Sequence, residues 1–432
     1  GIRRLVEQAQ SSTSRAQRLA DRAAALLFWF ALAAAVLSAI VWAVVGTPAE
    51  ALTRAITVLV IACPHALGLA IPLVVSIAAG RAALGGILIR DRLSLETMRT
   101  VDTVVFDKTG TLTEGRPALT GIDTDGHDDE VLALAAAAES DSEHPLARAI
   151  LAAAGSRGLD VPAATDFTSS PAVGVDARVG GRRVQVGGPG LLEREKVAPR
   201  AGAQQWRDEG ATVLHVLVDG SPVGALRLAD AVRPESRRAV EALQGRGVEV
   251  VMVTGDAESV AASVSAELGI TRHFAGVRPE GKSDIVARLQ SEGRRVAMVG
   301  DGVNDAPALA RADVGIAIGA GTDVAIASAG VVLASDDPRS VVSVIELSRA
   351  TYRKMQQNLW WAAGYNLVAV PLAAGVLAPI GVVMPMSVGA VLMSLSTVLV
   401  ALNAQTLRRL DLSPEAVAPL EPTPRTVETV AR

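Results

Sequence analysis

The sequence predicts a multidomain protein in which transmembrane α-helices flank a soluble α/β domain with a second, α+β domain inserted into it. Three observations lead to this prediction. Long uncharged apolar runs lie near both ends of the 432-residue chain. In much of the soluble block between them, buried-strand patterns alternate with helical patterns, as in a doubly wound sheet. The middle of that block instead has short alternating strands separated by Gly, Pro and Asp turns.

Composition narrows the class of protein before any motif is considered. Hydrophobic residues make up 50% of the chain, which argues against a wholly soluble protein. The formal net charge is −4, without the basic excess typical of nucleic-acid binding, so we expect no nucleic-acid partner. The single cysteine, Cys63, excludes an intramolecular disulfide.

Two pairs of membrane spans are predicted. In the first pair, residues 24–45 form an uncharged run with a tryptophan toward each end, and residues 55–79 form a run interrupted by prolines. Arginines after the second run place its carboxyl end on the cytoplasmic side. The second pair comprises residues 359–377 and 384–402, again with basic residues on both outer flanks.

These spans, and the change of pattern between them, divide the chain into six regions. We expect a linker helix with the first membrane pair, a first α/β part, the inserted domain, a second α/β part, the second membrane pair and a disordered tail. Their ranges are 1–82, 83–115, 116–228, 229–348, 349–410 and 411–432, in that order. The two α/β parts are expected to form one Rossmann-like sheet.

The polar string DKTGTLT, residues 107–113, follows a buried-strand pattern. Asp107 therefore lies at the carboxyl end of a strand, where open α/β sheets place their ligands. The string resembles the phosphorylation motif of the P-type ATPases, whose phosphorylation domain has a haloacid-dehalogenase-like fold. This resemblance implies that Asp107 attacks the γ-phosphate of ATP and becomes an aspartyl-phosphate. It also assigns Lys108 and Thr109 to the catalytic loop.

A second acidic motif lies at 301–305, directly after a predicted strand. Two carboxylates four residues apart beside a glycine turn can hold a hard cation such as Mg²⁺, together with water and phosphate oxygens. The surrounding string GDGVNDAPAL resembles the hinge of the P-type ATPases. The resemblance implies a Mg²⁺ site made by Asp107, Thr109, Asp301 and Asp305, with Asn304 ordering the phosphate.

Two shorter motifs are assigned to the phosphate by the same resemblance. Thr254-Gly255-Asp256 ends another predicted strand and matches the family's TGD motif, in which Thr254 donates a hydrogen bond to the phosphate and Asp256 belongs to the catalytic set. Lys282 follows an Arg-Pro-Glu-Gly turn and would neutralise phosphate charge as a point cation.

The inserted domain carries the expected nucleotide contacts. The string SEHPL at 142–146 matches the signature of the heavy-metal-translocating (type IB) branch of the P-type ATPases. The resemblance assigns His144 and Glu139 to the adenine end of ATP. Gly174 is the surviving glycine of the family's Gly-x-Gly loop, and a later Gly-Asn pair reads Gly-Gly here.

Cys63-Pro64-His65 predicts the cargo. A proline inside a membrane helix frees the carbonyl of Val60 and kinks the segment, and polar groups at that depth indicate function. A thiol and an imidazole suit copper better than alkali or alkaline-earth ions. The tripeptide resembles the CPH variant of the Cys-Pro-x motif of heavy-metal pumps, a branch associated with the export of copper, with silver as an alternative cargo.

The second membrane pair agrees with this branch. Its strings resemble the family's YN and MSxST patterns, and the resemblance implies Asn366, Met393 and Thr397 as further candidate ligands of the transported metal. Gly364 stands where the family has a further asparagine, so one candidate group is missing.

We therefore expect ATP-driven copper export by an integral, multi-pass protein of the cell membrane, with the phosphorylation and nucleotide domains in the cytoplasm. Two alternatives stay open. A pump for zinc, cadmium or cobalt is disfavoured by Met393, because a thioether is a poor ligand for those ions. A membrane-tethered haloacid-dehalogenase-type phosphatase usually has an acidic residue two positions after the nucleophile, where Thr109 stands.

One expected part of such a pump has no counterpart in the sequence. The family's actuator domain carries a Thr-Gly-Glu loop, and no TGE string occurs in these residues. The family's upstream membrane helices are not recognisable either. We therefore expect this chain to be the carboxyl-terminal part of a longer pump, able to accept phosphate from ATP but dependent on the missing actuator domain for a full transport cycle.

Overall fold

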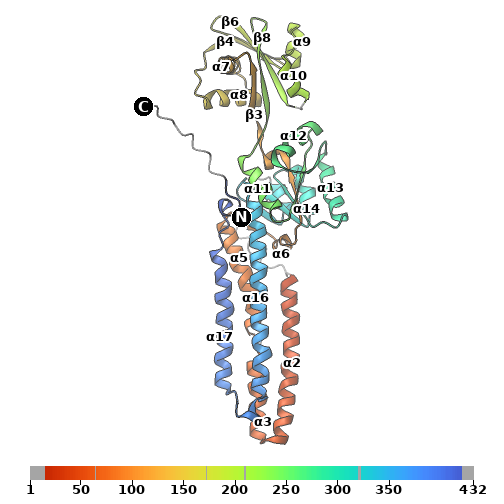
Figure 1. The fold of residues 1–432 in the computed structure, drawn as a ribbon, viewed down its shortest axis with the longest axis vertical. Helices are drawn as coiled ribbons and strands as arrows, with labels where there is room; N and C mark the ends of the chain where they lie inside the picture. Colours follow the sequence, from red (N-terminus) through yellow and green to blue (C-terminus); the bar gives the residue numbers. More distant parts are fainter. Residues whose placement is uncertain (1–14, 64, 172, 209–210, 320–322, 421–432) are drawn as a thin grey trace, which may run out of the picture. The chain divides into compact units, whose positions relative to one another are not determined.

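The computed structural model describes residues 15–63, 65–171, 173–208, 211–319 and 323–420 (Figure 1). The chain forms two compact units. The first comprises Gly1–Asp102, Ala287–Met298 and Ala306–Arg432, and the second comprises Thr103–Val286 and Val299–Asp305. The apolar helices belong to the first unit, and the inserted domain belongs to the second.

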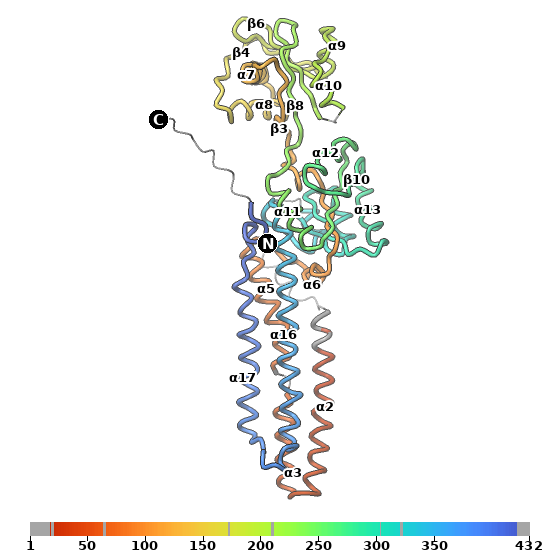
Figure 2. The backbone as a smooth tube through the Cα atoms, viewed as in Figure 1, coloured from red at the N-terminus to blue at the C-terminus, as the bar shows by residue number. Residues whose placement is uncertain are grey.

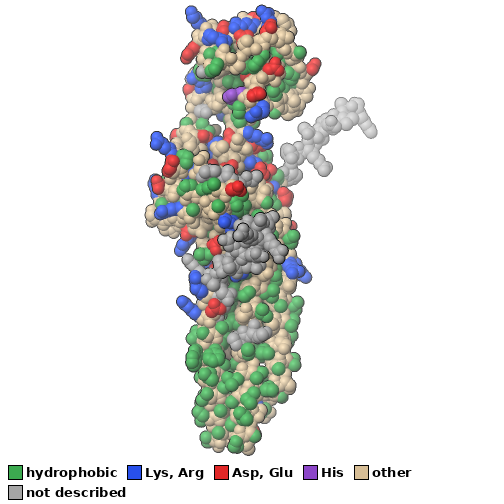
Figure 3. Space-filling view, turned by 180° about the vertical axis from the view of Figure 1, so that it is seen from behind, with side chains coloured by type: hydrophobic (Ala, Val, Ile, Leu, Met, Phe, Trp, Pro, Cys, Tyr) green, Lys and Arg blue, Asp and Glu red, His purple; other side chains and the backbone are tan. Residues whose placement is uncertain are grey.

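The long apolar helices are α2 (Arg15–Val45), α3 (Pro48–Ile61), α5 (Pro72–Leu84), α16 (Ser340–Ala374) and α17 (Met386–Gln405). Figure 2 shows α16 and α17 running side by side, and Figure 3 shows hydrophobic side chains gathered over the helical bundle. By length and composition, three stretches of the described residues can cross a membrane: Asp21–Val45, Pro48–Leu84 and Met386–Arg409. The predicted span at 359–377 lies in α16 up to Ala374 and is not among them, because polar residues such as Asn366 interrupt its apolar sequence. That span stays a prediction.

The second predicted span is broken near its prolines. Helix α3 ends at Ile61, the short helix α4 (His65–Ala70) follows, and α5 begins at Pro72. The carbonyl of Val60 accepts a hydrogen bond from the Cys63 N–H at 3.4 Å, so the end of α3 tightens toward a 3₁₀ turn. Pro64 and the side chain of His65 lie outside the described residues.

The α/β part is built on a seven-stranded sheet with the order β1-β13-β12-β11-β2-β9-β10. The strands are β1 (Ile87–Ile89), β2 (Thr103–Asp107), β9 (Glu249–Val253), β10 (Arg272–Phe274), β11 (Val296–Gly300), β12 (Val314–Ile318) and β13 (Val331–Leu333). The residues of β2, β11 and β12 are buried throughout, as expected for strands covered on both faces. β2 and β9 are parallel, with Asp107 opposite Val253. The Rossmann-like prediction is confirmed.

The inserted domain contains a six-stranded sheet with the order β3-β8-β7-β6-β5-β4, whose pairings are antiparallel where they are described. Its strands are β3 (Thr113–Thr124), β4 (Ala164–Ser170), β5 (Gly174–Val179), β6 (Arg182–Gly187), β7 (Thr212–Val218) and β8 (Ser221–Val232). Side-chain alternation divides β7 between two faces. Leu214 packs with α7 (Asp128–Ala138) and α8 (Pro145–Ser156), whereas Val213 packs with α10 (Ala201–Asp208).

The tail that the sequence predicts to be disordered is ordered in its described part. Leu412 and Ala418 are buried, and the short helix α18 (Pro414–Val417) lies between them. The buried guanidinium of Arg339 donates to the carbonyl of Ala418 at 3.1 Å. The disorder prediction is wrong for this segment because a composition rule does not register partners supplied by α16. Residues 421–432 lie outside the described part.

Candidate functional site

Charged side chains converge where the central strands β11, β2 and β9 end. These strands are neighbours in the sheet, so the residues that follow them share one edge. The converging side chains are Asp107 from β2, Asp301 and Asp305 from the segment after β11, and Lys282 from α13 (Pro279–Ser291). All of them belong to the second compact unit.

Lys282 lies between two of these carboxylates. Its Nζ donates to Asp107 Oδ1 and to Asp305 Oδ1, each at 2.7 Å. The side chains of Lys282 and Asp107 are each 9% exposed, and that of Asp305 is 1% exposed. Burial lowers the pKa of Lys282, but the two carboxylates outweigh burial and raise that pKa above its ordinary value. Lys282 is therefore a permanent buried cation in this site.

The electrostatics of Asp107 differ from those of an ordinary surface aspartate. Burial and the neighbouring Asp305 carboxylate raise the pKa of Asp107 to about 7, and Lys282 opposes this rise. Burial and Asp305 also raise the pKa of Asp301. The site thus holds more negative charge than Lys282 alone can neutralise, and it favours the approach of a further cation.

The three carboxylates fit Mg²⁺. One oxygen from each of Asp107, Asp301 and Asp305 lies within 4.8 Å of the others, and oxygen ligands of this kind are those that Mg²⁺ prefers. Gly110 allows the catalytic loop to approach this cluster: its φ is +77°, and a Cβ there would lie 2.1 Å from Asp301 Oδ2. Thr109, the other predicted Mg²⁺ ligand, is exposed on the same loop.

Lys108 turns away from the carboxylate cluster. Its buried Nζ forms ion pairs with Asp230 at 3.2 Å and with Asp256 at 3.0 Å. Asp230 also accepts hydrogen bonds from the Gly115 N–H at 2.9 Å and from the hydroxyl of Thr113. These contacts join the start of β3 to the end of β8, which we call the roots of the two strands that enter and leave the inserted domain.

Asp230 was not predicted from the sequence. It lies near the end of β8, just beyond the position at which the sequence places the end of the inserted domain. The signal that could have found it is structural: strands entering and leaving an inserted domain pair with each other, so polar residues at both roots meet. An aspartate at the exit root therefore faces the DKTGTLT loop.

The other predicted phosphate contacts lie at the same edge. Thr254 follows β9 and is buried, and its hydroxyl oxygen accepts a hydrogen bond from the Asp256 N–H at 3.1 Å. Asn304 lies in the short 3₁₀ turn η2 (Val303–Asp305) and is exposed. Both residues therefore lie close to the ends of the central strands.

The predicted nucleotide contacts lie in the second unit, in the inserted domain. Glu139 ends α7 and is buried; burial raises its pKa, while a hydrogen bond with Ser142 opposes that rise. His144 precedes α8 and is exposed, with its Nδ1 accepting from the Leu146 N–H at 3.2 Å. Gly174 pairs with β6 so closely that a Cβ would lie 2.1 Å from the Val186 carbonyl oxygen, which explains a glycine there without a ligand.

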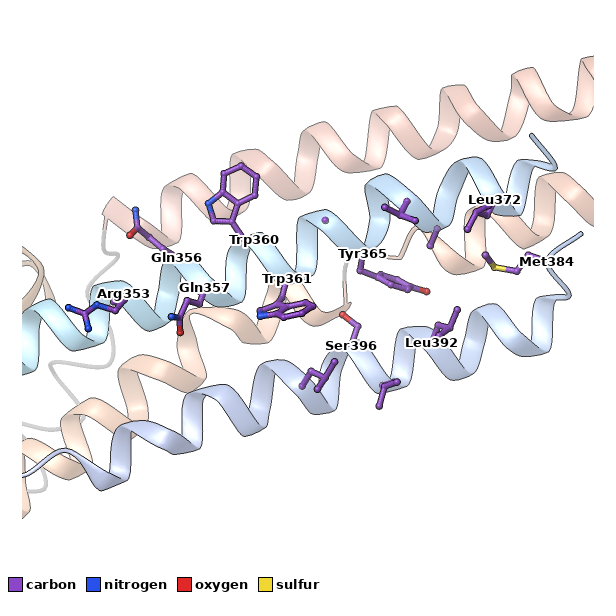
Figure 4. Close-up of a pocket in the computed structure, with 15 residues that line it drawn as sticks. Arg353, Gln356, Gln357, Trp360, Trp361, Tyr365, Leu372, Met384, Leu392 and Ser396 are labelled. Carbon is purple, nitrogen blue, oxygen red and sulfur yellow. The ribbon is translucent and has the colours of Figure 1, made fainter. Parts of the chain in front are cut away.

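The candidate ligands of the transported metal are spread over the segment after α3 and the helices α16 and α17. Cys63 is exposed, whereas Asn366 is buried and its Oδ1 has no hydrogen-bond partner among the described residues. The hydroxyl of Thr397 donates to the carbonyl of Met393 at 3.2 Å, within α17. Figure 4 shows that Tyr365, the residue before Asn366, lies in the groove between α16 and α17.

Comparison with known proteins places these sites in a family. A family model for haloacid dehalogenase-like hydrolases matches residues 101–313. The copper-exporting P-type ATPase B of Archaeoglobus fulgidus is 50% identical over 94% of this chain. A copper-exporting P-type ATPase of Bacillus subtilis is 43% identical over 94% of this chain. The chain spans 59% of the first relative and 51% of the second.

Solved structures give the same result. A zinc-transporting PIB-type ATPase in its E2.Pi state matches 94% of this chain, with a TM-score of 0.77 and 34% sequence identity, and the chain covers 67% of it. The chain belongs to the type IB P-type ATPases. The resemblance carried by DKTGTLT and SEHPL is therefore confirmed. As a member of the type IB P-type ATPases, the chain is an integral membrane protein, in agreement with its apolar helices.

Proposed function

We propose that this chain carries the phosphorylation, nucleotide-binding and metal-transporting parts of an ATP-driven copper exporter. The observation that carries the proposal is the buried Asp107 carboxylate, held by Lys282 and facing two further carboxylates. An oxygen of Asp107 attacks the γ-phosphorus of ATP, the bond to the β,γ-bridging oxygen breaks, and ADP leaves. Water later hydrolyses the aspartyl-phosphate, which releases phosphate and restores the carboxylate.

The surrounding residues supply charge and alignment. Lys282 neutralises negative charge on the transferred phosphoryl group, and Thr254 and Asn304 contact its oxygens. Asp107, Asp301 and Asp305 would hold Mg²⁺, with Thr109 as a further ligand. When bound, Mg²⁺ neutralises phosphate charge and orients the oxygens for transfer.

Glu139, His144 and Gly174 are proposed to bind the nucleotide, on the inserted domain. Lys108 and Asp256 hold the catalytic loop through their ion pair at 3.0 Å. Because Lys108 also binds Asp230 at the root of β8, nucleotide binding on the inserted domain has a direct connection to the loop that carries the nucleophile.

Copper is the cargo that ligand chemistry and relatives both support. A cysteine thiolate and a methionine thioether, as at Cys63 and Met393, are soft ligands. Asn366, whose Oδ1 has no hydrogen-bond partner among the described residues, is a further candidate in the second helix pair. Thr397 is a secondary candidate, because its hydroxyl already donates to the Met393 carbonyl, and His65 completes the CPH motif. The two relatives described above are named copper exporters. Silver is an alternative cargo of the same chemistry.

Zinc is the alternative with a specific observation behind it, because a solved structural neighbour is named a zinc transporter. Its identity to this chain, 34%, is lower than the 50% of the Archaeoglobus copper exporter. The phosphatase alternative is disfavoured because the exposed Thr109 cannot protonate a leaving group as a carboxylic acid does. The dependence on an actuator domain stays a prediction, which rapid metal-stimulated ATP hydrolysis by this chain alone would contradict.

Phosphoenzyme formation from radiolabelled ATP tests the proposal. Membranes containing the full-length protein would be incubated with Cu⁺, Cu²⁺, Ag⁺, Zn²⁺ or Co²⁺, and Asp107→Asn and His65→Ala would serve as comparison variants. We expect label with copper or silver only, and none in Asp107→Asn. Label driven by zinc or cobalt would retain the ATPase and overturn the cargo. No label with any metal would favour the phosphatase.

A further inference from the structure

A directed chain of hydrogen bonds crosses the helix bundle beside α4. Lys354 Nζ donates to Asn403 Oδ1 at 3.0 Å, and Asn403 Nδ2 donates to Asn358 Oδ1 at 2.8 Å. Asn358 Nδ2 then donates to the carbonyl of Ala70 at 3.3 Å. This series of hydrogen bonds therefore joins α16, α17 and the last residue of α4, all within the first compact unit.

These amides lie where polar groups are expensive. Asn358 has no exposed surface, although it is on a helix whose outer face carries exposed tryptophans such as Trp360. A buried amide in such a bundle costs free energy unless its hydrogen bonds are made, and it commonly marks function. Neither Asn358 nor Asn403 has a role in the proposed reaction so far, so the burial of Asn358 and its hydrogen bond with the half-buried Asn403 need another explanation.

The two ends of this series of hydrogen bonds, Lys354 and the Ala70 carbonyl, fix the orientation of both amides. An ammonium only donates hydrogen bonds, and a backbone carbonyl only accepts them. Asn403 must therefore turn its oxygen toward Lys354 and its NH₂ toward Asn358, and Asn358 must turn its NH₂ toward Ala70. The second N–H of Asn403 donates to Gln357 Oε1 at 3.2 Å. Reversing either amide would place two donors or two acceptors face to face.

The last acceptor in this series of hydrogen bonds, the Ala70 carbonyl, lies in the segment that carries the CPH motif. Helix α4 runs from His65 to Ala70, and α5 begins at Pro72, which has no N–H. Carbonyls at the end of such a short helix need partners from outside it, and Asn358 supplies one for Ala70. Asn366 lies about two helical turns further along α16 than Asn358.

We propose that Asn358 and Asn403 are positioning residues for the transported metal. They hold α4, and with it His65, in a fixed register with α16 and α17, and so set the metal affinity of the membrane site. Lys354 orients the pair from its outer end. The inference rests on the proposed function, because it assigns the transported metal to the segment around Cys63 and His65.

Metal titration of phosphoenzyme formation tests this inference in membranes that contain the full-length protein. The variants are Asn358→Leu, Asn403→Leu and Lys354→Met, titrated with Cu⁺ and with Cu²⁺. Because residues that orient metal ligands typically change affinity by about 10–100-fold, we expect each Asn→Leu variant to need at least about tenfold more copper for half-maximal label. The maximal label at saturating copper should be retained. Gln356→Leu, on an exposed position of the same helix, is the matched control and should titrate as the wild type.

An isosteric variant separates direction from packing. Asn403→Asp preserves shape and keeps the acceptor for Lys354, whose ammonium favours the ionised carboxylate, and this carboxylate cannot donate to Asn358. A role in packing alone predicts a wild-type titration for this variant, and that result would overturn the inference. If an asparagine variant fails to fold, Lys354→Met carries the test, and an unchanged titration in it would count against the inference. Wild-type protein without metal-dependent label would instead show that the proposed function is wrong.

Discussion

In the phosphoryl-transfer site, side chains from separate elements meet within hydrogen-bonding distance. In the membrane site, by contrast, the described side chains show a bond within one helix at Thr397 and an Asn366 Oδ1 without a hydrogen-bond partner. Lys282, on α13, donates at 2.7 Å both to Asp107 at the end of β2 and to Asp305 after β11. By contrast, the hydroxyl of Thr397 donates to a carbonyl of its own helix at 3.2 Å. The two sites thus use their polar groups in opposite ways.

The difference follows from the elements that carry the residues. Neighbouring strands of a doubly wound sheet end at a common edge, so residues that follow them meet whatever their separation along the chain. Helix positions meet only where two helices pack with a particular rotation, and serine or threonine hydroxyls have a local carbonyl available. The phosphoryl-transfer site is therefore specified by sheet topology, while the membrane site depends on helix packing.

Of four replacements in the two sites, Lys282→Met should slow phosphorylation by ATP the most. A small effect would contradict the contrast between the two sites. The variant leaves the Asp107 and Asp305 carboxylates facing each other without a buried cation. Removing one preorganised charge of this kind typically costs about 10²–10³-fold in rate, so we expect a loss of that order in the initial rate of phosphorylation by ATP. Lys196→Met, at an exposed position of the inserted domain, is the control. Equal phosphorylation rates in both variants would show that Lys282 takes no part in phosphoryl transfer.

Replacing Gly110 with alanine tests whether the catalytic loop must touch Asp301. The new Cβ would lie 2.1 Å from Asp301 Oδ2, and the φ of +77° adds backbone strain. Gly158→Ala is a matched control, because its φ is +65° and nothing lies within 4 Å of its Cβ. Each variant should lose about 1–2 kcal/mol of stability from the backbone. Only Gly110→Ala should also raise the Mg²⁺ concentration needed for half-maximal phosphorylation, and equal Mg²⁺ curves would contradict the geometry.

The sequence could predict the elements of the sheet but not all the partners at its edge. The strands predicted to lead into Asp107 and into Asp301 are present as β2 and β11. Asp107 and Asp301 could be expected to meet, because both follow buried strands of one sheet. Asp230 could not be found in this way, because its partner Lys108 lies on a loop whose path is decided by how β3 and β8 pair.

The membrane region was harder to predict for a related reason. Periodicity and proline positions indicate the break between α3 and α5, yet they do not say which amides meet. Asn358 and Asn403 look like ordinary polar interruptions of apolar runs until α16 and α17 are packed together. The tail shows the same limit, since its residues are ordered by partners such as Arg339 that composition does not reveal.

Replacing Asn366 with alanine sharpens the comparison at the membrane site. Its buried Oδ1 has no hydrogen-bond partner among the described residues, so it is available to a metal ion. Loss of one ligand or orienting group typically changes metal affinity by about 10–100-fold, and we expect at least about tenfold more copper for half-maximal phosphoenzyme. Gln356→Ala, exposed on the same helix, controls for polarity on α16. An unchanged copper titration would show that the unpaired oxygen serves packing instead.

Replacing Thr397 with valine should give the smallest effect. Its hydroxyl proton is already donated to the Met393 carbonyl, and valine keeps the branched shape while removing only that local bond. Substitutions of this kind usually stay within about 0.5 kcal/mol, so the copper concentration for half-maximal label should change by no more than about twofold. A tenfold shift, as expected for Asn366→Ala, would mean that the hydroxyl oxygen binds the metal through its remaining lone pair. The membrane site would then join ligands from two helices, and its contrast with the phosphoryl-transfer site would disappear.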